Sequence, residues 1–163
     1  MTSLKVAGFL DHSTVNGEGF RSTLFLSGCL HNCQSCHNKA MQDFDYGDTL
    51  SISSIIEKVQ KNLPIIDGIT ISGGDPFEQS ANLYTLLTQL KILNLSVWVY
   101  TGYTYEYLTT HESYRKLLPL IDVLVDGPFI EILKTDSKKY VGSSNQRILS
   151  LLNGKIKEEL NYK

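Results

Sequence analysis

The chain has 163 residues, of which 42% are hydrophobic and 20% are charged. These proportions are those of a globular protein, and the length suits a single domain that spans residues 1–163. A net charge of −2 and apolar runs of only strand length argue against a nucleic-acid binder and against a membrane protein. Because the chain does not open on an export signal, we expect a cytoplasmic protein.

Short apolar runs alternate with helical patterns, which predicts an α/β fold with a mostly parallel sheet. The first strands are expected at residues 6–10 and 23–27. An amphipathic helix follows, with apolar residues at spacings of three and four: Ile52, Ile55, Ile56 and Val59. Ser54 and Glu57 could form its capping box, or the helix could begin a turn earlier at Ser51.

The middle of the chain predicts a buried strand at residues 69–72, followed by a glycine pair and a helix. Asp75 suits the N-cap of this helix, Pro76 its first position, and Glu78 the other half of a capping box. The core face of the helix is expected to consist of leucines: Leu83, Leu86, Leu87, Leu90 and Leu93.

The last part of the chain predicts strands at 97–100 and 123–126 and a weaker one at 146–149. A short helix is expected from Thr104 and another helical turn at 115–118. The charged segment 155–163 is expected to fray.

Loops with unusual composition follow four of the expected strands. They contain the cysteines, Gly73-Gly74, Thr101-Gly102-Tyr103 and Gly127-Pro128. In barrels and in open α/β sheets, ligands bind at the carboxyl ends of the strands. The sequence therefore predicts a site at this edge.

Cys29, Cys33 and Cys36 are the only cysteines, and they fall within eight residues. An odd number of thiols so close together argues against a disulfide framework. A structural zinc ion could take His31 or His37 as its fourth ligand, but such sites usually consist of two separated ligand pairs. An iron–sulfur cluster fits better, because cysteine thiolates are its standard ligands and three of them would leave one iron open.

The spacing C-x-x-x-C-x-x-C resembles the cluster loop of the radical S-adenosylmethionine enzymes. The resemblance implies that Cys29, Cys33 and Cys36 hold a 4Fe–4S cluster whose fourth iron binds S-adenosylmethionine. It also implies contacts of Ser35, Cys36 and His37 with this cofactor. Position 35 is often aromatic in the superfamily, so the small Ser35 implies fewer side-chain contacts with adenine.

Ser72-Gly73-Gly74-Asp75-Pro76 is explained first by a tight turn into a capped helix. It also resembles the glycine-rich motif that binds the methionine part of the cofactor in the same superfamily. Gly73, Gly74 and Asp75 are accordingly expected to bind S-adenosylmethionine.

Further segments occur in an order that is similar to one family, the activating proteins of the anaerobic (class III) ribonucleotide reductase. They are Asn16-Gly17-Glu18-Gly19-Phe20-Arg21, Cys36-His37-Asn38, Tyr100-Thr101-Gly102-Tyr103, Asp126-Gly127-Pro128-Phe129 and Gly142-Ser143-Ser144-Asn145-Gln146-Arg147. This resemblance covers residues 6–149. It implies a compact, incomplete (β/α) barrel of the radical S-adenosylmethionine type.

The resemblance implies an enzyme in which a reduced cluster cleaves S-adenosylmethionine to a 5′-deoxyadenosyl radical. That radical takes a hydrogen atom from a C-terminal glycine of the reductase large subunit. The implied partners are this subunit and a low-potential electron donor such as a flavodoxin. No residue is expected to act as a general acid or base; the histidines are expected on the surface or in local hydrogen bonds: His12, His31, His37 and His111.

Other functions remain open at this stage. The chain could activate a different glycyl-radical enzyme or act on a small molecule, although its short length argues against a small-molecule pocket of its own. An electron carrier or a zinc-stabilised binding module would explain the cysteines. Neither would explain the glycine pair or the loops that share one edge.

Overall fold

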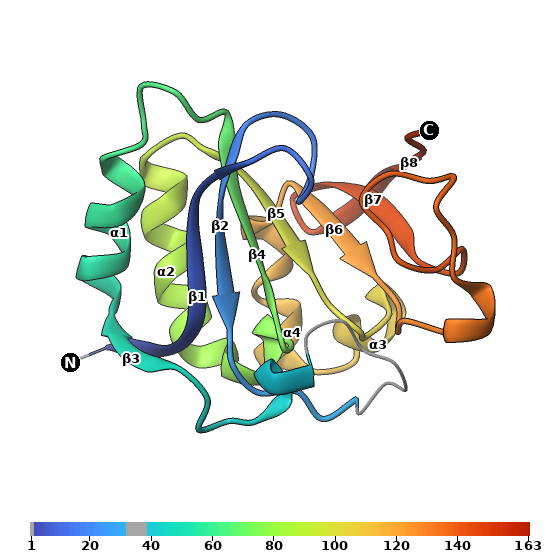
Figure 1. The fold of residues 1–163 in the computed structure, drawn as a ribbon, viewed down its shortest axis with the longest axis horizontal. Helices are drawn as coiled ribbons and strands as arrows, with labels where there is room; N and C mark the ends of the chain where they lie inside the picture. Colours follow the sequence, from blue (N-terminus) through green and yellow to red (C-terminus); the bar gives the residue numbers. More distant parts are fainter. Residues whose placement is uncertain (1, 32–38) are drawn as a thin grey trace.

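A computed structural model of the chain describes residues 2–31 and 39–163, and shows an eight-stranded sheet with helices against it (Figure 1). The expected α/β class is confirmed. The strands are β1 (Ser3–Ser13), β2 (Arg21–Leu26), β3 (Asp48–Ser51), β4 (Gly68–Gly73), β5 (Ser96–Tyr100), β6 (Val123–Asp126), β7 (Arg147–Leu152) and β8 (Lys155–Leu160). Their order in the sheet is β3-β1-β2-β4-β5-β6-β7-β8.

The centre of the sheet is parallel and both of its sides are antiparallel. Strands β2, β4, β5 and β6 pair in parallel, whereas β1 and β3 on one side and β7 and β8 on the other pair antiparallel. The prediction of a mostly parallel sheet is therefore wrong, since three of the seven pairings between described strands are parallel. A parallel pair needs a crossover segment of a dozen or more residues, and only a two-residue turn joins β7 to β8.

All six expected strands are present, with boundaries shifted by a few residues. The short strand β3 was not expected, and residues 155–160 form β8 instead of fraying. The turn before β8 is Asn153-Gly154, and both residues have a positive φ, of 53° and 82°. Asn-Gly is a strong hairpin signal, because this turn type needs a positive φ at both positions.

Two helices, α1 (Ile52–Gln60) and α2 (Ser80–Ile92), cover one face of the sheet (Figure 1). Helix α1 begins after Ser51, whose hydroxyl accepts from the Ser54 N–H at 3.2 Å, so the earlier of the two expected starts is confirmed. In α2, Leu83, Leu86, Leu87 and Leu90 are fully buried as expected, and Leu93 is partly buried. No helix in the described ranges is long and apolar enough to cross a membrane.

The remaining helical elements are short, and most of them follow a strand. They are α3 (Tyr105–Thr109), α4 (Glu112–Arg115) and the 3-10 turns η1 (Lys39–Gln42), η2 (Pro76–Gln79), η3 (Leu118–Leu120) and η4 (Glu131–Leu133). The short helix expected from Thr104 is present as α3, and Thr104 is its N-cap, because its hydroxyl accepts from the Tyr107 N–H. The helical turn expected at 115–118 is divided between the end of α4 and the start of η3.

The capping box expected before α2 is only half formed. The Asp75 carboxylate accepts from the Phe77 N–H at 3.1 Å and caps η2. Glu78 instead accepts from the hydroxyl of Tyr103 at 2.7 Å, and the Asp75 N–H donates to the carbonyl of Gly28. Tertiary partners therefore replace the local bond that the sequence pattern predicts.

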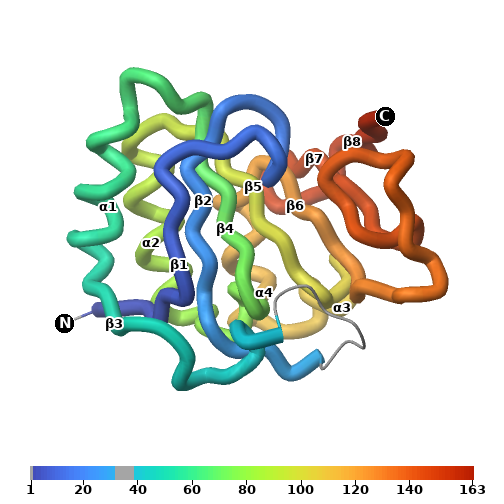
Figure 2. The backbone as a smooth tube through the Cα atoms, viewed as in Figure 1, coloured from blue at the N-terminus to red at the C-terminus, as the bar shows by residue number. Residues whose placement is uncertain are grey.

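The face of the sheet opposite α1 and α2 carries a smaller apolar cluster and the site. Trp98, Val123, Val125 and Ile148 form this cluster. Side chains alternate across a strand, so Val97 and Val99 point to the helices while Trp98 and Tyr100 point to this second face. Figure 2 shows the segments that follow β2, β4, β5 and β6 at the same end of the molecule.

Candidate active site

A pocket of about 440 Å³ opens at the carboxyl ends of the parallel strands. Its lining includes residues from each of the four loops that the sequence assigned to this edge: Cys29, Gly73, Gly74, Thr101, Gly102 and Gly127. The predicted convergence of these loops is confirmed. Of the expected site residues, Cys33, Cys36, Ser35 and His37 lie outside the described residues.

Backbone hydrogen bonds close the base of the cysteine loop. The N–H groups of Gly28 and Cys29 donate to the carbonyls of Met41 and Gln42, at 2.7 and 3.1 Å. The segment that enters this loop is thus held beside the segment that leaves it, next to the end of β2. Cys29 is placed on the pocket wall by the fold itself.

The glycine pair lies directly against this base. Gly73 has a φ of +114°, which favours glycine. A Cβ atom on Gly74 would come within 2.5 Å of the carbonyl oxygens of both Gly28 and Met41. Only a residue without a side chain lets the two backbones approach so closely.

The residues present fit an iron–sulfur group. Cys29 offers a thiol to the same pocket that the glycine pair lines, and thiolates are the usual ligands of such clusters. Gln42 also lines the pocket, and its buried Nε2 has no hydrogen-bond partner within the described part of the chain. Among residues 2–31 and 39–163, no three potential metal ligands converge at one point.

The carboxylate of Asp75 joins three loops. It is fully buried and accepts from the Thr101 hydroxyl at 3.0 Å, the Gly102 N–H at 2.9 Å and the Phe77 N–H. His31, two residues after Cys29, lies with its Nε2 at 2.6 Å from Asp75. This hydrogen bond raises the pKa of His31, whose expected role in local hydrogen bonding is confirmed.

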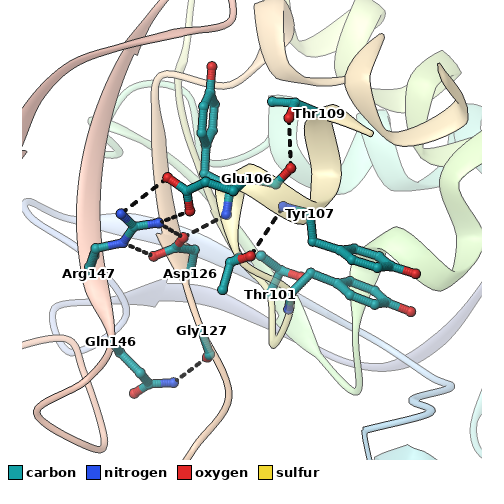
Figure 3. A network of polar contacts seen from close by, with 11 residues as sticks. Thr101, Glu106, Tyr107, Thr109, Asp126, Gly127, Gln146 and Arg147 are labelled. Atoms are coloured by element: carbon teal, nitrogen blue, oxygen red, sulfur yellow. Dashed lines mark hydrogen bonds and ion pairs between the residues drawn. The ribbon is translucent and has the colours of Figure 1, made fainter. Parts of the chain in front are cut away.

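The far wall of the pocket consists of two segments that also belong to the family pattern (Figure 3). Gln146 donates to the Gly127 carbonyl at 3.0 Å and accepts from the Gly142 N–H at 2.8 Å. Asn145 donates to the Pro128 carbonyl at 2.8 Å. These amide side chains hold the loop after β6 against the start of β7.

Arg21 organises the glycine-rich segment that precedes β2. Its guanidinium is 2% exposed and donates to Thr70 Oγ1 at 2.8 Å and to the Ser96 carbonyl at 2.7 Å. Burial lowers the pKa of Arg21 to about 10. Thr70 in turn donates to the carbonyl of Asn16, which places Asn16 on the pocket wall.

Two pocket residues were not expected from the sequence, Phe25 and Gln42. Phe25 could have been found by alternation, because its neighbours Leu24 and Leu26 are in the core against the helices. Nothing local in the sequence marks Gln42, whose position depends on where the cysteine loop ends.

Residues 15–149 match the model of a family described as a 4Fe-4S single cluster domain. The chain is similar to proteins named anaerobic ribonucleoside-triphosphate reductase-activating protein. The one from Pasteurella multocida (strain Pm70) is 39% identical over 142 residues, which cover 82% of this chain and 89% of that protein. The one from Enterobacteria phage T4 is 32% identical over 151 residues, which cover 89% of this chain and 93% of that protein. The one from Escherichia coli (strain K12) is 36% identical over 140 residues, which cover 81% of this chain and 89% of that protein.

The fold is similar to that of QueE from Escherichia coli, in a crystal structure that matches with a TM-score of 0.52 at 15% identity. The match covers 63% of this chain and 53% of QueE, so this chain spans about half the length of that protein. A likeness at this identity concerns the fold alone.

The match to the family model thus defines an iron–sulfur protein of the single-cluster type, with which the pocket beside Cys29 agrees. The chain belongs to the family of anaerobic ribonucleoside-triphosphate reductase-activating proteins. This membership confirms the resemblance found in the sequence, and with it the activating function and an iron–sulfur cluster as cofactor.

Proposed function

We propose that this chain activates an anaerobic ribonucleotide reductase by placing a radical on a C-terminal glycine of the large subunit. The observation that supports this most strongly is one pocket shared by Cys29 and the Gly73-Gly74 backbone. A cofactor that is bound to a cluster needs a cysteine that holds the cluster. It also needs a stretch of backbone without side chains that the cofactor can approach closely. Family membership supplies the reductase as the target.

The cluster would be held by Cys29, Cys33 and Cys36, and S-adenosylmethionine by the backbone around Ser35, Cys36 and His37 and by the segment Gly73-Gly74-Asp75. When bound, these groups supply one electron and the 5′-deoxyadenosyl radical that removes a hydrogen atom from glycine. The chain's own residues bind and orient the cofactor and limit access of water. Hydrogen-atom abstraction needs no proton transfer, so no acid or base is assigned.

The sheet supports an incomplete (β/α) barrel with an open side, within a single domain of residues 1–163. Strands β3 and β8 are the two ends of the described sheet. An open side suits a glycine-bearing loop that a partner protein presents. Thiolate ligands require a reducing compartment, which favours the cytoplasm, with a low-potential donor such as a flavodoxin as the source of electrons.

The test is anaerobic reconstitution with iron and sulfide, followed by chemical reduction of the cluster with dithionite in the presence of S-adenosylmethionine and the anaerobic reductase from the same source. A glycyl-radical doublet in the electron paramagnetic resonance spectrum and stoichiometric 5′-deoxyadenosine are expected. Cys33→Ala is the control and should give neither. If 5′-deoxyadenosine forms but the reductase acquires no radical, the target is a different protein or a small molecule.

A further inference from the structure

We propose that the Asp75 carboxylate is a positioning group for the cysteine loop and does not itself contact the cofactor. The inference rests on the proposed cluster at Cys29, and it changes the role that the resemblance gave to Asp75. Only the backbone of the glycine-rich segment then faces the ligand.

The burial of Asp75 is the first observation. Its side chain is 0% exposed, and the residues that line the pocket include its neighbours Ser72, Gly73 and Gly74 but not Asp75 itself. Both carboxylate oxygens already accept hydrogen bonds from protein donors. A carboxylate so placed has no surface to offer to a bound molecule.

The second observation is that Asp75 holds the chain on both sides of Cys29. Its backbone N–H donates to the carbonyl of Gly28 at 2.7 Å, and its carboxylate lies 2.6 Å from the ring of His31. One residue therefore binds the positions immediately before and shortly after the first cysteine. Charge-assisted bonds of this length are the stronger kind.

The third observation is that Asp75 connects the cysteine loop to two other loops of the pocket. It directly follows the glycine pair, and its carboxylate also binds Thr101 and Gly102 after β5. The cysteine loop, the glycine pair and the β5 loop are thereby fixed to one buried group. A cluster on the cysteine loop would keep a constant position relative to a cofactor on the glycine pair.

His31→Ala and Asp75→Asn test this link, with retention of iron in the absence of S-adenosylmethionine as the readout. After anaerobic reconstitution, loss of iron to a chelator should be about tenfold faster in each variant than in the unmodified protein. The paramagnetic spectrum of the reduced cluster, recorded without cofactor, should change its g-values. In the double variant the loss should be no faster than in Asp75→Asn alone, because that substitution already weakens the bond that His31→Ala removes.

Matched controls come from the same chain. Asp122→Asn removes a carboxylate that also accepts a backbone N–H, from Val97 at 2.8 Å, but lies away from the pocket. His12→Ala removes a ring that stacks on Phe20 at 4.8 Å. Both controls should lose iron within twofold of the unmodified rate.

The inference is overturned if His31→Ala and Asp75→Asn keep iron at the unmodified rate, whatever they do to cofactor affinity. If Asp75→Asn does not fold, His31→Ala decides, because it removes one bond of a side chain that is 16% exposed. The assay contains no reductase. A failure of the unmodified protein to make the glycyl radical, with the variants losing iron as expected, would therefore count against the proposed function and not against this link.

Discussion

Arg147 holds the carboxylate of Asp126 through two hydrogen bonds, at 3.0 Å from Nε and 2.6 Å from Nη2 (Figure 3). Asp126 is 1% exposed, and it also accepts from the Tyr105 N–H at 2.7 Å. Nη2 of Arg147 reaches Glu106 in α3 at 2.7 Å. The ends of β6, β7 and α3 are therefore joined beside the pocket, and these bonds raise the pKa of Arg147.

Arg147→Met is expected to lower the free energy of unfolding by about 3 kcal/mol, because it leaves a buried carboxylate without its cation. Urea unfolding measured by circular dichroism gives this difference. Arg115→Met removes a guanidinium that donates to the Thr109 carbonyl at a long 3.5 Å, and should cost less than about 0.5 kcal/mol. Equal losses in the two variants would contradict this role of Asp126.

Glu106→Gln tests the exposed half of the same network. The side chain of Glu106 is 64% exposed, so solvent screening limits the loss at pH 7 to about 0.5 kcal/mol. The hydrogen bond from Arg147 lowers the pKa of Glu106 from its ordinary 4.5. The contribution is thus fully present above pH 4.5 and is lost as the pH falls through the folded-state pKa. Unfolding free energies of both proteins between pH 7 and pH 3 should converge; a difference that grows on acidification would refute this.

Gly74→Ala should impair the pocket more than it impairs the fold. Its Cβ would meet two backbone carbonyl oxygens at 2.5 Å, and neither can move without opening the base of the cysteine loop. We expect about 1–3 kcal/mol of destabilisation and a large loss of reconstituted iron. Gly8→Ala is the control, since its Cβ would lie 3.8 Å from Phe25. Iron content equal in the two variants would be inconsistent with this packing.

Arg21→Met should destabilise the chain by about 3 kcal/mol or more, because buried carbonyls of β4 and the β5 start lose their donor. Arg21→Lys keeps the charge but not the fork of donors, so it should recover only part of the loss. Thermal unfolding of the three proteins gives the order. If Arg21→Met lowered stability by less than 1 kcal/mol, Arg21 would not be the group that holds residues 16–20.

The order of strands and helices could be predicted because each carries its own periodicity and caps. The isoleucines of α1 and the leucines of α2 repeat at helical spacing, and Ser51 caps α1. Asp75 caps the turn η2 instead of α2, whose N-cap position is occupied by Gln79. The direction of the outer strands could not be predicted in this way. The direction of an outer strand depends on which edge of the sheet is still unpaired when the strand adds to it. Strand β8, for example, pairs antiparallel with β7.

The hydrogen-bond partners of the side chains around the pocket could not be predicted from the sequence either. Glu78 is in a capping position by sequence, but Tyr103 lies closer to its carboxylate and takes the bond. His31 has no local signal that distinguishes it from the other histidines, and its partner Asp75 is 44 residues away in the chain. Contacts between residues so far apart arise only when the sheet brings its loops together.

The sequence by itself determined the chemistry: three thiols at a fixed short spacing, a glycine pair at the end of a strand, and the family to which the ordered motifs belong. These features are local, so residue type and spacing specify them. Only the tertiary structure decided that Asp75 is buried among protein donors and that Arg147 binds Asp126 beside the pocket. Burial and long-range pairing depend on how strands align, and strand alignment minimises the free energy of the whole chain and not of any one segment.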